Sequence, residues 1–312
     1  ENLVLVLDGE NDALQTQVAA EMFESRGRID YFIEVGRNEK LADEHPEWIC
    51  SLQGHPEWRH KFPEVGEPGD DELVKCYPWV SVFYESAFQA HLERIKKLLA
   101  NKPKPTRIWL NDLQAGPSAC GCGHILCRWT TDYGPVATAD KLGDDAIALF
   151  VAEVKRVAPD CEVIPILTTE CEEADKECEC GGVDCFQGIC WRAFSKQLDF
   201  VAQDSPVIGV ACFYKLFDRD LERYGVEASW VRFAVESLEK MPPMRGGKGV
   251  ETLRTVAILQ GWDVDESELI AQKKKAVDSG AKGWLVVRTA INQSWEPRVI
   301  RFERNVIRKN LR

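Results

Sequence analysis

The sequence is short of basic residues and of long apolar runs, and each shortage excludes a class of function. Of its 312 residues, 39 are Lys or Arg and 51 are Asp or Glu, which gives a formal net charge of −12. Because binding to phosphates needs clustered basic side chains, this charge argues against nucleic acids and anionic membrane surfaces as partners. No apolar run approaches the roughly 18 residues of a membrane-spanning helix. The longest runs, such as Leu3–Leu7, have the length of a strand.

Two further absences disfavour particular classes of protein. No Gly-x-Gly-x-x-Gly motif follows a predicted strand, which disfavours an open, dinucleotide-binding α/β sheet. The chain has only five histidines, and none of them stands at the end of a predicted strand. A hydrolase that binds its catalytic metal through histidine is therefore disfavoured.

The cellular compartment is indicated only weakly. The sequence begins with Glu1 rather than Met, which is compatible with the removal of a secretory signal. We therefore expect a secreted or periplasmic protein. The sequence contains no indication of the oligomeric state.

The order of the predicted elements indicates the fold class. Short β-branched runs alternate with longer amphipathic stretches, which is typical of right-handed βαβ units and a parallel sheet. Eight such units predict a single-domain (β/α)₈ TIM barrel over residues 1–312. The predicted strands are Leu3–Leu7, Ile29–Val35, Val74–Trp79, Arg107–Leu110, Glu162–Thr169, Val207–Phe213, Thr255–Gln260 and Gly283–Thr289. The predicted helices are Ala13–Arg26, Val82–Leu99, Lys141–Val157, Trp191–Ala202, Val226–Lys240 and Glu266–Asp278.

Acidic residues recur where the predicted strands end, and aromatic residues stand near them. In a TIM barrel these strand ends form the face that carries the active site. The acids are Asp8, Glu10, Glu34, Asp112, Glu170, Asp218, Asp263 and Asp265, and the aromatics are Trp79, Trp109, Tyr214, Trp262 and Trp295. Carboxylates together with indole faces are typical of sugar binding, and two facing carboxyl groups can cleave a glycosidic bond. Any single acid could equally cap the helix that follows it.

Nine of the 12 cysteines are organised around two of these acids. They are Cys76, which precedes the others, Cys120, Cys122 and Cys127 after Asp112, and Cys171, Cys178, Cys180, Cys185 and Cys190 after Glu170. The two cysteine-rich loops follow the strands counted as fourth and fifth, so we expect them to be neighbours on the catalytic face. Thiolates at such spacing can surround a structural Zn²⁺, and disulfides are the alternative. Cys161 and Cys212 are predicted to be plain buried thiols.

One stretch of sequence resembles a known family. The run Trp109-Leu110-Asn111-Asp112, followed by Cys120-x-Cys122-x₄-Cys127 and preceded by Cys76, resembles the family 42 glycoside hydrolases, the beta-galactosidases of clan A. The resemblance covers roughly residues 76–130. It implies that Asp112 matches the acid/base of that family, that Asn111 matches the Asn before it, and that the four cysteines hold zinc. The chain departs from the family in having Asp in place of Glu at residue 112, and Gln260 with no Glu at the end of the seventh strand.

The sequence as a whole predicts a glycoside hydrolase that acts on an oligo- or polysaccharide. Asp112 is the expected general acid, and either Glu170 or Asp263 is the expected second carboxylate. The residues expected to contact the carbohydrate are Glu10, Trp79, Asn111, Tyr214, Trp262 and Trp295. The alternative hypothesis is a non-catalytic carbohydrate-binding or scaffold barrel that has lost its nucleophile.

Overall fold

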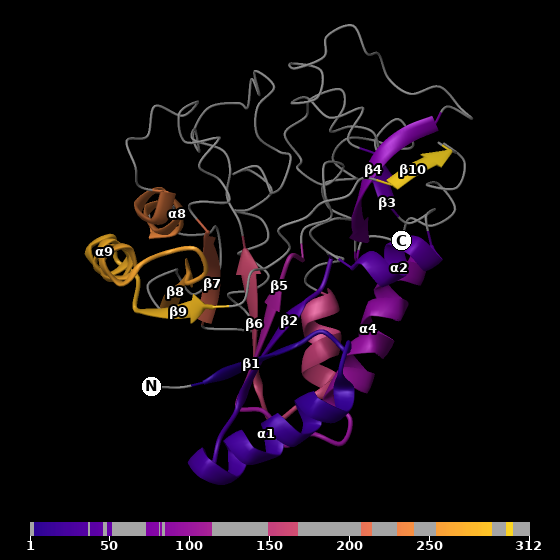
Figure 1. The fold of residues 1–312 in the computed structure, drawn as a ribbon, viewed down its shortest axis with the longest axis horizontal. Helices are drawn as coiled ribbons and strands as arrows, with labels where there is room; N and C mark the ends of the chain where they lie inside the picture. Colours follow the sequence, from indigo (N-terminus) through magenta and orange to yellow (C-terminus); the bar gives the residue numbers. More distant parts are fainter. Residues whose placement is uncertain are drawn as a thin grey trace, which may run out of the picture.

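A parallel sheet of seven strands forms the centre of the molecule (Figure 1). The computed structural model describes residues 3–36, 38–45, 49–51, 73–80, 82, 85–113, 149–167, 207–213, 230–239, 254–288 and 298–301. In spatial order the strands are β1 (Val4–Leu7), β2 (Asp30–Glu34), β5 (Arg107–Asn111), β6 (Glu162–Leu167), β7 (Val207–Cys212), β8 (Arg254–Gln260) and β9 (Gly283–Val287). Because spatial order follows sequence order and every neighbouring pair is parallel, the predicted α/β class with a parallel sheet is confirmed.

The sheet is curled like part of a barrel. Residues from both edge strands, such as Val4 of β1 and Leu285 of β9, line the same cavity on its concave side. Within the described residues, β1 pairs only with β2, and β9 pairs only with β8. The described part of the chain therefore forms a seven-stranded half-barrel rather than the eight-stranded closed barrel that was predicted.

The prediction was wrong about the partners of the strand at Val74–Trp79. This segment forms β4 (Leu73–Val80), which pairs antiparallel with β3 (Ile49–Ser51) and β10 (Arg298–Arg301) in a separate sheet. The side of β2 that β4 was expected to occupy is taken by β5, and their pairing continues beyond both strands through a 2.8 Å hydrogen bond from Gly36 N to Asp112 O. Pro78 also lacks the N–H that a strand inside a parallel sheet would donate.

The described helices begin and end at residues suited to those positions. They are α1 (Asp12–Arg26), α2 (Glu39–Glu44), α4 (Glu85–Leu99), residues 149–157, α8 (Trp230–Glu239) and α9 (Glu266–Asp278). Asn11 caps the start of α1, and Gly27 ends it with a φ of 67°, a left-handed conformation that glycine adopts without strain. The predicted helix Trp191–Ala202 lies outside the described residues. Within the described part of the chain, no helix combines the length and apolar character required to cross a membrane.

Alternation along the strands determines which side chains reach the concave face. Ile33 of β2 and Leu110 of β5 point outward and pack into a core with Phe88 of α4 and Phe150. The rings of Phe88 and Phe150 meet edge to face, with centroids 5.1 Å apart. The intervening residues point inward. The concave face therefore receives Asp30, Phe32 and Glu34 from β2, and Arg107, Trp109 and Asn111 from β5.

Candidate active site

Glu34 and Asn111 form a pair at the carboxyl edge of the sheet. They are the last residues of β2 and β5, and the register places them directly opposite each other. The side-chain amide Nδ2 of Asn111 donates to both carboxylate oxygens of Glu34, at 3.0 and 3.1 Å. Because Asn111 is only 7% exposed, its amide can hold the Glu34 carboxylate in one orientation.

Asp112 follows this pair on a turn of the backbone. Its φ of 56° lies in the left-handed region, which Asp tolerates better than most residues with a Cβ. The turn depends on Gly36, because a Cβ at that position would lie 2.3 Å from the Asp112 carbonyl oxygen. The same Cβ would lie 3.6 Å from Oδ2 of Asp112, so the half-buried carboxyl group lies beside the end of β2. Unusual backbone geometry of this kind is often found at functional sites.

A partly buried arginine brings positive charge to this edge. Nη2 of Arg94, on α4, donates to the main-chain oxygen of Glu34 at 2.5 Å. Burial lowers the pKa of Arg94 to about 10, while the negative charges of Glu34 and Asp8 act to raise it. Arg94 therefore stays charged at neutral pH and places a positive charge at this edge of the sheet.

Asp8 is held by its own local contacts at the end of β1. Its Oδ1 accepts hydrogen bonds from Glu10 N at 2.9 Å and from Gln15 Nε2 at 2.5 Å. Asp8 thereby stabilises the turn from β1 into α1. The side chain of Glu10, which was predicted to contact carbohydrate, is exposed in this turn.

The end of β8 carries the amide of Gln260 and no carboxylate. Gln260 is 1% exposed, and its Nε2 donates to Trp262 O at 3.1 Å. Gln272 of α9 accepts from Gln260 N at 3.2 Å and donates to Gln260 O at 3.0 Å. Trp262 is 7% exposed and packs against Phe213, with ring centroids 5.1 Å apart. Most of the Trp262 indole is thus committed to packing, and its predicted contact with carbohydrate stays a prediction.

Two acids after β8 have different environments. Asp263 is exposed and has a φ of 52°. Asp265 is the N-cap of α9: its Oδ1 accepts from Glu268 N at 2.8 Å, and Glu268 Oε2 accepts from Asp265 N at 2.8 Å. The capping alternative is therefore confirmed for Asp265, whereas the catalytic role of Asp263 stays a prediction.

Several predicted site residues cannot be placed relative to this edge. Cys76 and Trp79 belong to β4, where only the backbone is described, and Ser51 of β3 is the register partner of Cys76. The predicted site residues outside the described ranges are Glu170, Tyr214, Trp295, Cys120, Cys122, Cys127, Cys171, Cys178, Cys180, Cys185 and Cys190. Among the residues that are described, no group of three His, Cys, Asp or Glu side chains could hold a metal ion.

The two cysteines that were predicted to be plain buried thiols are confirmed as such. Cys161 and Cys212 are buried and form no disulfide. Burial raises the pKa of the Cys161 thiol to about 11, and it also raises the pKa of Cys212. Both thiols are therefore protonated at neutral pH and are poor metal ligands or nucleophiles.

Glu34 and Arg94 were absent from the predicted site. Glu34 was recognised as an acid near a strand end, but the sequence does not show that its partner is Asn111, 77 residues further along. Arg94 lies one residue before Ile95 on the buried side of α4. A basic residue beside an apolar helix face is the signal that could have indicated it.

No protein-family model matches the sequence. No curated protein matches it either. Among solved structures, the chain is similar to a variant of the glycoside hydrolase domain of PelA from Pseudomonas aeruginosa, with a TM-score of 0.42 and 11% identity over 92% of this chain and 94% of that one. It is also similar to bee venom hyaluronidase, with a TM-score of 0.43 and 12% identity over 93% of this chain and 91% of that one.

A third similar structure is alpha-L-fucosidase isoenzyme 2 from Paenibacillus thiaminolyticus, with a TM-score of 0.44 and 13% identity. The match covers 86% of this chain but only 35% of the fucosidase. These likenesses concern the fold alone.

Proposed function

We propose that the protein is a glycoside hydrolase that acts on an oligo- or polysaccharide at the carboxyl edge of its parallel sheet. The observation that carries the proposal is the Glu34–Asn111 pair beside Asp112. Hydrolysis of a glycosidic bond commonly uses two carboxyl groups, one protonated and one ionised. This edge brings two together at the ends of neighbouring strands, where barrel enzymes perform their chemistry.

The surroundings of the two carboxyl groups support different roles. Glu34 accepts hydrogen bonds from the Asn111 amide and lies in the field of Arg94, and both interactions favour the carboxylate. Glu34 is thus suited to act as the nucleophile or as the base that activates water. Asp112 keeps the role of general acid that the sequence predicts, which requires it to be protonated before it donates to the leaving oxygen.

Glu170 and Asp263 remain alternatives to Glu34 as the second carboxylate. Glu170 follows β6, the neighbour of β5, and Asp263 follows β8. The anomeric configuration of the first product, measured by NMR, indicates how far apart the two catalytic carboxyl groups lie. Retention indicates carboxyl groups about 5–5.5 Å apart, and inversion indicates about 6.5–9.5 Å.

The test is hydrolysis of a panel of oligosaccharides by purified variants. Glu34→Gln and Asp112→Asn should each lower kcat about 10²–10⁴-fold, because each removes one half of the acid and base pair. Glu24→Gln, which removes an exposed carboxylate on α1, is the matched control and should retain wild-type activity. Wild-type rates in Glu34→Gln would exclude Glu34, and wild-type rates in Asp112→Asn would exclude the proposed general acid.

A non-catalytic carbohydrate-binding barrel is the second candidate. The observation in its favour is the end of β8, where the side-chain amide of Gln260 donates to Trp262 O, Gln272 bonds the main chain of Gln260, and no carboxylate stands at that position. A protein of this kind would bind sugar equally well with Asp112→Asn and would cleave no glycoside. Measuring binding and hydrolysis on the same oligosaccharides separates the two candidates.

We also propose that the cysteine-rich loops hold a structural zinc ion, with disulfides as the alternative. The support is their Cys-x-Cys-x₄-Cys spacing, which suits a closed tetrahedral thiolate site. The test is metal analysis combined with thiol counting on the purified protein. Bound zinc, together with thiols that can be titrated only after chelation, supports the metal site. A protein that contains neither zinc nor titratable thiols indicates disulfides.

A further inference from the structure

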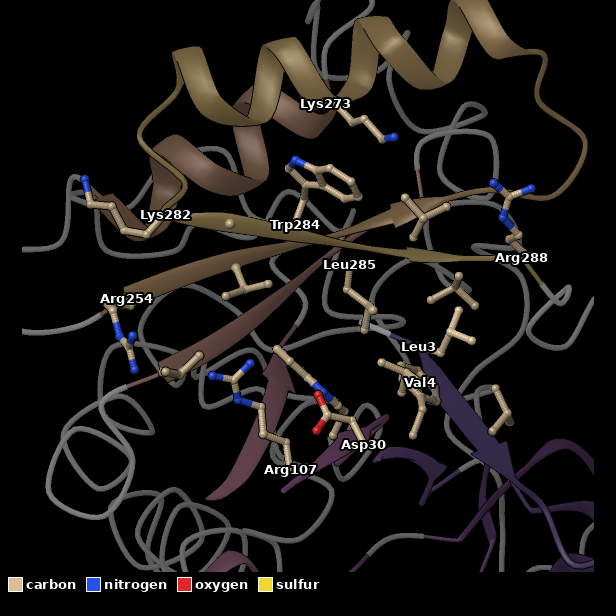
Figure 2. Close-up of a pocket in the computed structure, with 18 residues that line it drawn as sticks. Leu3, Val4, Asp30, Arg107, Arg254, Lys273, Lys282, Trp284, Leu285 and Arg288 are labelled. Carbon is tan, nitrogen blue, oxygen red and sulfur yellow. The ribbon is translucent and has the colours of Figure 1, made fainter. Parts of the chain in front are cut away.

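The concave side of the sheet contains a cavity at the end opposite to the candidate active site. Its volume is about 510 Å³, and it is lined by the first residues of several strands, among them Asp30, Arg107 and Arg254 (Figure 2). Glu34 and Asn111, by contrast, are the last residues of their strands. The volume lies within the range of small-molecule sites in proteins, roughly 300–1,000 Å³.

One part of the cavity wall is apolar. Val4, Phe32, Val207, Val256 and Leu285 come from five different strands and line it together. At Gly283, which also lines it, an added Cβ would meet only Cγ2 of Val256, at an ordinary 3.8 Å. The space beside Gly283 is therefore open and can accept apolar atoms.

The described residues of the cavity lining include five basic side chains and one acidic side chain. Arg107 and Arg254 share the single carboxylate of Glu162, with an Nε–Oε2 distance of 2.9 Å for Arg107 and an Nη2–Oε1 distance of 3.9 Å for Arg254. Burial raises the pKa of Asp30, the only acid among the described residues of the lining, while the nearby Arg107 acts to lower it.

Further basic residues flank the opening. Lys282 and Arg288 lie at opposite ends of β9, and Lys273 of α9 lies over the ring of Trp284, with its Nζ 4.1 Å from the ring centroid (Figure 2). The chain as a whole carries a net charge of −12, so this basic lining stands out against an acidic protein. A ligand with a negative charge would complement it.

A buried donor also points into this region. Trp109 is 4% exposed, and a hydrogen bond from its indole N–H to Asp30 acts to lower the pKa of that carboxyl group. The geometry of this hydrogen bond is poor. An oxygen atom of a ligand in the cavity can therefore share the N–H with Asp30.

We propose that this cavity binds a small carboxylate with an apolar body. The carboxylate lies between the guanidinium groups of Arg107 and Arg254 and accepts from the Trp109 N–H, and the apolar body lies along Val256 and Leu285. The planar guanidinium fork suits a carboxylate, and the apolar wall suits a hydrocarbon chain or ring. An alcohol of the same length would lose the charge-assisted hydrogen bonds, and an amine would be repelled.

The test is calorimetric titration of the full chain with octanoate, octan-1-ol and octylammonium. We expect saturable binding of octanoate, at least about tenfold weaker binding of octan-1-ol, and no binding of octylammonium. No saturable binding of octanoate at millimolar concentration would overturn the proposal. Octylammonium that binds as tightly as octanoate would overturn it as well.

Three variants locate the site. Arg254→Gln, at a side chain that is 56% exposed, should weaken octanoate about tenfold and leave octan-1-ol unchanged. Trp109→Phe keeps an aromatic ring but removes the N–H, and it should also weaken octanoate. Gly283→Leu fills the cavity and should abolish the binding of both ligands while thermal unfolding remains cooperative.

A matched control completes the design. Lys274→Gln removes an exposed cation that pairs with Asp278 on α9 and does not line the cavity, so octanoate affinity should be unchanged. If octanoate affinity is unaffected by both Arg254→Gln and Gly283→Leu, the ligand binds elsewhere and the proposal is wrong. Neither result depends on whether the carboxyl edge hydrolyses glycosides.

Discussion

His91 is buried completely on α4 in a neutral form. Its Nε2 lies 2.6 Å from the main-chain oxygen of Val80, and its ring meets Phe150 nearly at right angles, with centroids 6.3 Å apart. Burial, together with the positive charge of Arg94, lowers the pKa of His91 to about 3. The imidazole therefore donates its Nε2–H to Val80 and remains uncharged at physiological pH.

This buried histidine should make the protein sensitive to acid. In the unfolded chain a histidine takes up a proton below about pH 6.5, whereas folded His91 does so only near pH 3. Between these values the unfolded state binds one proton more, so stability falls as pH falls, by up to about 1.4 kcal/mol per pH unit from this residue. His91→Gln keeps a donor for Val80 and removes the titration. Urea unfolding at pH 7, 6, 5 and 4 should show a shallower loss of stability for the variant, and equal slopes would contradict the assignment.

At the scale of elements, the start of α9 places a capping acid, Asp265, two residues after a proposed catalytic acid, Asp263. Asp265→Ala removes the capping box and should lower the free energy of unfolding by about 1 kcal/mol. Asp263→Asn keeps a residue type that tolerates the φ of 52°, so stability should fall by less than it does in Asp265→Ala.

Denaturant unfolding and oligosaccharide hydrolysis, measured on both variants, test these two assignments. Loss of hydrolysis in Asp263→Asn at unchanged stability would identify Asp263 as the second carboxylate in place of Glu34. Retained hydrolysis would leave Glu34 or Glu170. A change in stability for Asp263→Asn equal to that of Asp265→Ala would mean that Asp263 also supports the start of the helix.

At the scale of the whole molecule, the curled sheet has protected central strands and less protected edges. Every residue of β7 is buried, and β7 and β8 each pair on both sides, whereas β9 pairs only with β8 within the described residues. Backbone amides in the core exchange their hydrogens only when the whole protein unfolds, so their exchange reports the free energy of global unfolding. Amides at the edges of the sheet exchange through local openings of lower free energy.

Hydrogen exchange followed by mass spectrometry should resolve this difference. We expect peptides from β7 and β8 to exchange most slowly and peptides from β9 to exchange through an opening of lower free energy. Peptides from α1, on the outside of the sheet, serve as an internal reference for a solvated element. Equal protection of β9 and β7 would show that the second edge of β9 is paired in solution and that the half-barrel is closed.

Much of the architecture could be predicted from the sequence because it depends on local patterns. The strand at Ile29–Val35 was predicted from a short β-branched run, and the helix at Glu266–Asp278 from a longer amphipathic stretch. The same kind of pattern placed Asn111 and Asp112 at a strand end. The position of the strand at Val74–Trp79 was also predicted, but its partners were not, because strand pairing depends on segments far apart in the chain.

The sequence by itself determined the α/β class, the positions of most strands and helices, the acidic balance and the presence of carboxyl groups near strand ends. Only the tertiary structure decided that β2 pairs with β5, which brings Glu34 to Asn111 and Arg94 to Glu34. It also decided that Arg107 and Arg254 meet at one carboxylate beside an apolar cavity. The physical reason is that periodicity and capping act within a few residues, whereas register and the curl of the sheet arise from packing over the whole chain.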